Sequence, residues 1–162
     1  KTEYPNILYV IAGSGAELDN LKKITSELDI NKNVIFLGDI NNNQKKYLFK
    51  NTKLMVMPTL DESKKSSIEG FGIAYLEAAY YGIPSIASDV GGTPEAVIHN
   101  ETGIIITDIS ELYNTLKELL SNKAKLDELG KNAKLRVKKY FIWEIVGNKY
   151  LQLIKNLGNL NK

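Results

Sequence analysis

The sequence predicts an α/β fold in which a Rossmann-like parallel sheet is flanked by helices. Residues 7–12 (ILYVIA) are almost wholly apolar and end at a glycine turn, which is typical of a strand buried on both faces. Leu18, Leu21, Ile24 and Leu28 follow at helical spacing, with polar residues between them. Strands and helices then continue to alternate, which predicts parallel strands joined by right-handed crossovers.

The later elements follow in the same order. The expected strands are short apolar runs, and they are residues 34–37, 54–57, 85–87 and 103–106. Between the strands, helical periodicity predicts helices in residues 44–50 and 73–81. A helical C-terminal region at about 110–157 follows, with helices expected in residues 110–120, 123–139 and 143–157. Tyr140, Phe141 and Trp143 are expected to anchor the last helix on the core rather than stack on a ligand.

Composition excludes several classes of function. With 21 basic and 19 acidic residues the net charge is only +2, so there is no electrostatic reason to expect a nucleic-acid partner. The absence of cysteine rules out disulfides, a thiolate zinc site and a cysteine nucleophile, and the default location is the cytoplasm. No apolar run approaches the ~20 residues that span a bilayer. Neither a metal site nor a cofactor is expected.

The first glycine turn, Gly13-Ser14-Gly15, is similar to the start of a dinucleotide-binding loop. A G-x-G-x-x-G pattern would however need glycine where Leu18 stands. The dinucleotide interpretation therefore fails. A structural role in the turn is favoured, and the approach of a phosphate is only permitted.

A second loop, in residues 66–79, contains the two most unusual charges. Glu69 and Glu77 are the only side chains charged at neutral pH between Lys65 and Asp89, and they lie among small and apolar residues. A buried carboxylate without a partner is unfavourable, so each glutamate needs a partner or a polar ligand.

Glycines beside these glutamates create an anion site. Gly70 and Gly72 allow a tight turn that leaves the amides of Gly72, Ile73 and Ala74 open at a helix N-terminus, which suits a diphosphate. Glu77, about one turn further, could accept hydrogen bonds from the two hydroxyls of a ribose. The residues alone leave a second possibility equally open, in which the glutamates only cap the helix or pair with lysine.

The residues around this loop resemble a known family. Glu69 and Glu77 enclose Gly70-Phe71-Gly72-Ile73, and Gly82, Pro84 and the run DVGGTPE at 89–95 follow. This pattern resembles the donor-binding, C-terminal domain of retaining glycosyltransferases of the GT-B fold, family GT4 (glycosyltransferase group 1). The resemblance extends from residue 7 to residue 103.

The resemblance implies a role for each matched position. Glu77 would bind the nucleotide ribose, and Glu69 would contact the transferred sugar and act as the catalytic carboxylate, stabilising the oxocarbenium-like sugar. The remaining implied positions are substrate-binding: the diphosphate amides Phe71, Gly72 and Ile73, the glycine turn Gly13 and Gly15, the base loop at Gly38 and Ile40, and the cleft loop Gly91 and Gly92. No metal ligand is implied, and the nucleotide-diphosphate sugar would be a substrate rather than a cofactor.

The resemblance also implies parts that residues 1–162 do not supply. Residues 1–162 would form a single donor-binding domain, whereas the first strand of the domain, its two diphosphate-binding cations and the N-terminal acceptor domain would precede it. Arg136, the only arginine, does not match either cation. A sheet completed within these residues would refute the missing strand, and the fragment alone is expected to be inactive.

The resemblance is compatible with several donors, acceptors and locations. The full-length protein would transfer a sugar, with retention, to a lipid-linked, polysaccharide or small-molecule acceptor, and the residues specify neither the base nor the sugar. Peripheral association with the inner membrane face is left open beside a cytoplasmic location. The alternatives are a non-catalytic nucleotide-binding or assembly module and a phosphorylase or epimerase of the same fold.

Overall fold

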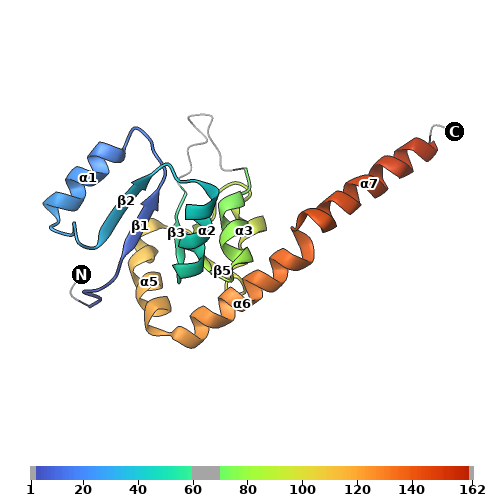
Figure 1. Ribbon diagram of the computed structural model, residues 1–162. Helices are drawn as coiled ribbons and strands as arrows, with labels where there is room; N and C mark the ends of the chain where they lie inside the picture. The colour runs from blue at the N-terminus through green and yellow to red at the C-terminus, as the bar shows by residue number, and fades with distance from the viewer. Residues whose placement is uncertain (1–2, 60–69, 161–162) are drawn as a thin grey trace. The chain divides into compact units, whose positions relative to one another are not determined.

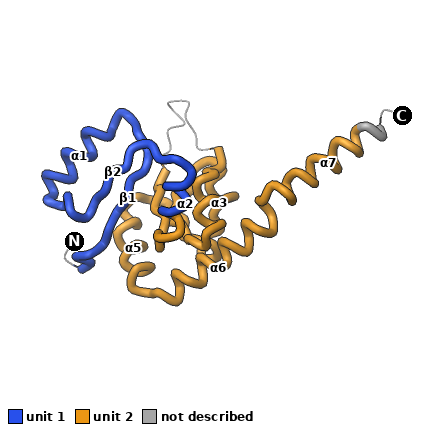
Figure 2. The backbone as a smooth tube through the Cα atoms, viewed as in Figure 1, with its two compact units in different colours: residues 1–48 blue, residues 49–162 orange. Residues whose placement is uncertain are grey.

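The computed structural model describes residues 3–59 and 70–160, with side chains to residue 157. Figure 1 shows the helices and strands of the chain. The chain divides into two compact units, residues 1–48 and residues 49–162 (Figure 2). Each unit contains parallel strands and helices, which confirms the predicted α/β class.

The first unit contains a two-stranded parallel sheet. Strand β1 (Tyr9–Ala12) leads through a glycine turn to α1 (Leu18–Glu27) and then to β2 (Val34–Gly38). The register pairs Val10 with Ile35, so these two side chains lie on the same face. Helix α2 (Asn42–Asn51) follows.

Strand β1 is not buried on both faces, so this expectation was wrong. Tyr9 is 48% exposed, and on β2 the exposed Ile35 and Leu37 alternate with the half-buried Val34 and Phe36. The physical reason is that β1 pairs along one edge only, with β2, among the described strands. The burial expected of a central strand needs neighbours on both edges and cover on both faces.

The second unit contains a three-stranded parallel sheet in the order β3-β4-β5. These strands are β3 (Met55–Met57), β4 (Ser85–Ser88) and β5 (Gly103–Ile106). Central β4 is the strand that is buried on both faces, and Ile86 and Ala87 are fully inaccessible. No strand pairing in the described ranges joins this sheet to the β1-β2 sheet, so one continuous sheet is not formed there.

Helices connect and cover these strands. α3 (Ile73–Tyr80) links β3 to β4, and a short helix, α4 (Thr93–Ala96), which the sequence did not predict, precedes β5. A 3-10 turn, η2 (Ile109–Glu111), then leads into α5 (Leu112–Ser121) and α6 (Lys123–Tyr140).

Helix α6 comes very close to the end of α3. A Cβ atom added to Gly130 would overlap the carbonyl oxygen of Gly82, so the absence of a side chain permits the approach. Ala79 of α3 and Ala133 and Val137 of α6 form a buried cluster beside this contact. The small residues therefore fix α6 against α3.

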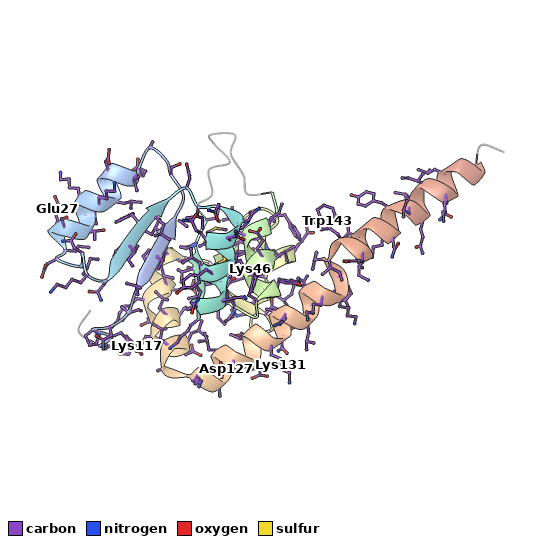
Figure 3. All side chains as sticks on the ribbon, viewed as in Figure 1. Glu27, Lys46, Lys117, Asp127, Lys131 and Trp143 are labelled. Atoms are coloured by element: carbon purple, nitrogen blue, oxygen red, sulfur yellow. The ribbon has the colours of Figure 1, made fainter. Side chains whose placement is uncertain are left out.

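The last helix, α7 (Trp143–Leu160), is only partly anchored. Phe141 packs against the cluster of Ala79, Ala133 and Val137, as expected, but Trp143 is 86% exposed (Figure 3). The expected anchoring by Trp143 was therefore wrong, because the half-buried positions near it are Ile142, Ile145 and Val146, and Trp143 lies between them on the exposed side. In the described part of the chain, no helix is both long and apolar enough to cross a membrane.

Candidate functional site

Helix α3 begins at a left-handed glycine. Gly72 has φ 79° and ψ 61° and occupies the N-cap position, and no described side chain caps the helix there. Its carbonyl accepts a hydrogen bond from the Tyr75 amide at 2.9 Å. An uncapped helix N-terminus directs backbone N–H groups and the positive end of the helix dipole outward, which favours a bound anion.

The Tyr75 side chain packs against this turn. A Cβ atom on Gly72 would overlap the Tyr75 ring, which is 1% exposed. The Tyr75 hydroxyl donates to the carbonyl oxygen of Met57, at the carboxyl end of β3, at 2.5 Å. The ring and the hydroxyl therefore fix the start of α3 against the end of a core strand.

The glycine loop after β4, Gly91–Gly92, lies against the loop at Gly70–Gly72. Gly91 has a positive φ of 55°, and a Cβ atom on Gly92 would overlap the carbonyl oxygen of Gly70 and lie 3.2 Å from the Cα of Phe71. In a parallel sheet the carboxyl ends of neighbouring strands lie at the same edge, and ligands bind there. The structure thus brings the loops at Gly70–Gly72 and Gly91–Gly92 together at the carboxyl ends of β3 and β4.

Glu77 lies on α3, four residues after Ile73 and so about one turn into the helix. Its side chain is half-buried, while Ile73 is exposed. Glu69, the predicted catalytic carboxylate, lies outside the described residues. Of the two glutamates, the structure therefore places only Glu77, on the helix that begins after Gly72.

The predicted residues of the first unit form a second pair of adjacent loops. The Gly13 amide donates to the carbonyl oxygen of Gly38 at 2.8 Å, and the Ser14 hydroxyl donates to Asp39 Oδ1, also at 2.8 Å. Gly15 is exposed and Ile40 is half-buried. The turn after β1 and the turn after β2 thus lie side by side within this unit.

Three site features were not predicted from the sequence. Tyr75 had no identifiable role because a tyrosine in the first turn of an apolar helix is indistinguishable from a core residue. The contact between Gly92 and Gly70 joins residues far apart in the chain. Thr93 is fully buried, and its Oγ1 has no hydrogen-bond partner in the described structure.

The polar groups at the start of α3 include backbone amides and one carboxylate. Within residues 3–59 and 70–160, no group of three or more His, Cys, Asp or Glu side chains is placed to hold a metal ion. The backbone amides at the α3 N-terminus and in the glycine loop beside it are hydrogen-bond donors, and the Glu77 carboxylate is an acceptor. Together they can bind a phosphate group and a hydroxyl-bearing group next to it.

Comparisons with known proteins show the family of this chain. Residues 1–136 match the model of the family Glycosyl transferases group 1. The chain is 29% identical over 154 residues to the GDP-mannose-dependent monoacylated alpha-(1-6)-phosphatidylinositol monomannoside mannosyltransferase of Corynebacterium glutamicum, which covers 94% of this chain and 40% of that protein.

Solved structures share the fold. Sucrose-phosphate synthase from Thermosynechococcus elongatus superposes with a TM-score of 0.79 at 29% identity, over 94% of this chain and 38% of that one. Anabaena Alr3699/HepE in complex with UDP-glucose superposes with the same TM-score at 20% identity, over 94% and 42%. The chain thus spans about two fifths of the length of each of these proteins. With its α/β fold, its paired glycine loops and a family match over most of its length, the chain belongs to the glycosyl transferases group 1 family.

Proposed function

We propose that this chain is the donor-binding domain of a retaining glycosyltransferase, which transfers a sugar from a nucleotide-diphosphate sugar to an acceptor hydroxyl. The single observation that carries the proposal is the start of α3, where the left-handed Gly72 occupies the N-cap position and Glu77 follows about one turn later. The family match supports sugar transfer as the reaction, and the relatives' names include a GDP-mannose-dependent enzyme and a complex with UDP-glucose.

In this proposal the diphosphate binds the amides of Phe71, Gly72 and Ile73, and Glu77 accepts hydrogen bonds from the ribose hydroxyls. These assignments are compatible because a carboxylate directed at hydroxyls avoids repulsion with the phosphate oxygens. Negative charge that develops on the departing diphosphate would be stabilised by amides already in place, which lowers the barrier without a reorganisation step.

Glu69 would act on the other side of the breaking bond. As the anomeric carbon loses the diphosphate, positive charge develops on the sugar ring, and a carboxylate nearby stabilises it. Gly91 and Gly92 would line the cleft, Gly38 and Ile40 would lie near the base, and Gly13 and Gly15 would form the glycine turn. The intact protein would supply the acceptor site from an N-terminal domain.

A further strand beside β1 is part of the same proposal. The described strands β1 and β3 each lie at the edge of their own sheet, and a strand edge with no partner exposes N–H and C=O groups. A further parallel strand that pairs along β1 would also reduce the exposure of Tyr9. We propose a cytoplasmic location for the intact protein, with peripheral contact to the inner membrane face if its acceptor is lipid-linked.

The role of Glu77 can be tested by comparing ligands as well as variants. In the intact protein, Glu77→Ala should weaken binding of the nucleoside diphosphate by about 10- to 100-fold, because charge-assisted hydrogen bonds to two hydroxyls are lost. With a 2′,3′-dideoxy analogue the same substitution should have almost no effect. Glu128→Ala, which removes an exposed carboxylate on α6, is the matched control.

The catalytic proposal needs a separate test. Incubation of the intact protein with GDP-, UDP- and ADP-sugars and candidate acceptors should yield a glycoside with retained configuration, and Glu69→Gln should reduce transfer much more than nucleotide binding. Equal losses of transfer and binding would indicate a binding module. Formation of a sugar phosphate or an epimerised sugar nucleotide would indicate a phosphorylase or an epimerase.

A further inference from the structure

Arg136 differs from the two basic side chains nearest to it along its helix. Lys134 and Lys138 are exposed, whereas Arg136 is half-buried. Its guanidinium donates from one nitrogen to the carbonyl oxygen of Glu95 at 2.7 Å and from the other to that of Ala96 at 3.1 Å. Two carbonyls at the end of α4 are thus bound by one planar group, a geometry that lysine cannot reproduce.

Arg136 is also connected to the loop at Gly70–Gly72, through two aromatic rings. The guanidinium carbon lies 4.8 Å from the centroid of the Phe141 ring, within the range of a cation–π interaction. The Phe141 ring in turn contacts the Phe71 ring, with centroids 5.7 Å apart. Phe71 directly precedes Gly72, so one side of Arg136 is connected to the loop that opens α3.

Helix α4 connects Arg136 to the loop at Gly91–Gly92. Arg136 binds the last turn of this four-residue helix, and Gly92, its N-cap, lies against the backbone of Gly70 and Phe71. The two loops and Arg136 therefore form a closed ring of contacts: Phe71 to Phe141, Phe141 to Arg136, Arg136 to α4, and α4 through Gly92 back to Phe71.

We propose that Arg136 is a positioning residue of the donor site, which sets the relative position of the two glycine loops without contacting the nucleotide. This inference rests on the proposed function for what the loops bind. It assigns a role to the only arginine in the chain, which is joined to the phosphate site through Phe141 and through α4 rather than by direct contact. Rigid support of this kind matters because binding groups displaced by a fraction of an ångström lose much of their effect.

The test compares two substitutions that remove the same charge from α6. In the intact protein, Arg136→Gln should weaken binding of UDP or GDP, whichever the unmodified protein binds, by about three- to tenfold. The reason is that the two glycine loops would no longer be connected through the Arg136 side chain. Lys131→Gln removes an exposed positive charge five residues away (Figure 3) and should leave binding unchanged. Arg136→Lys keeps the charge but loses the planar fork, and it should behave like Arg136→Gln.

A second measurement separates positioning from stability alone. In protein without ligand, Arg136→Gln should shift the NMR resonances of the Phe71, Gly72, Gly91 and Gly92 amides together, at a temperature where denaturation curves show the variant folded. A lower unfolding midpoint with unchanged nucleotide affinity and unchanged loop resonances would overturn the inference. If the unmodified protein binds no nucleoside diphosphate, the proposed function fails, and the amide resonances alone decide whether Arg136 positions the loops.

Discussion

Replacing Gly72 by alanine tests the turn on which the candidate site depends. The backbone at Gly72 is left-handed, with φ 79°, and an L-residue in that conformation is disfavoured by about 1–2 kcal/mol. The new Cβ would also overlap the buried Tyr75 ring, and overpacking of this kind costs about 1–3 kcal/mol. We therefore expect Gly72→Ala to lower the free energy of unfolding by about 2–5 kcal/mol.

The assay is chemical denaturation of the protein and the variant, followed by nucleotide titration under conditions where both are folded. Gly147→Ala is the matched control, because Gly147 lies inside α7 and the added Cβ would have no described atom within 4 Å apart from its chain neighbours and the backbone of its own helix. That substitution should be neutral or stabilising by about 0.5–1 kcal/mol. Equal stability and equal nucleotide affinity for Gly72→Ala and the unmodified protein would refute the proposed geometry of the turn.

Two further substitutions test local interactions. Tyr75→Phe should lower the unfolding free energy by about 0.5–1.5 kcal/mol, because the hydrogen bond to the carbonyl of the half-buried Met57 is lost, whereas Tyr80→Phe at an exposed position should have little effect on denaturation curves. Hydrogen bonds from Thr107 and from the Asp108 amide lower the pKa of Glu111, so its stabilising effect is present above the ordinary glutamate pKa of 4.5 and is lost as the pH falls below it. Glu111→Gln should therefore lower the thermal unfolding midpoint at pH 7, and it should lower the midpoint less at a pH below 4.5. An equal decrease of the midpoint at the two pH values would contradict this.

Much of the fold could be predicted because local sequence and tertiary structure agree. The predicted strand at 103–106 and the observed β5 coincide, and α3 differs by one residue from the predicted 73–81. Helix α2 begins at Asn42, two residues before the predicted start, because the side chains of Asn41 and Gln44 cap each other's backbone amides. Capping of this kind is a sequence feature that hydrophobic periodicity overlooks.

The errors have a different physical origin. Burial of Tyr9 and of Trp143 depends on what covers a strand or helix, and an apolar run does not specify its own partner. The contact of Gly92 with Gly70 and the contacts of Arg136 are likewise tertiary, since they join segments that no local pattern connects. The glycines and Glu77 could be identified from sequence because their chemistry is unusual in an apolar stretch, whereas Tyr75 and Arg136 act through their neighbours.

The most direct measurement of the central claim is an NMR titration of the intact protein with UDP, GDP and ADP, in which the backbone amides are followed individually. Binding of a nucleoside diphosphate at the start of α3 predicts the largest shifts for Phe71, Gly72 and Ile73, with smaller shifts at Gly91 and Gly92. Loss of these shifts with the corresponding nucleoside would identify the diphosphate as their cause. Absence of any change at α3 with all three nucleotides would contradict the proposed donor site.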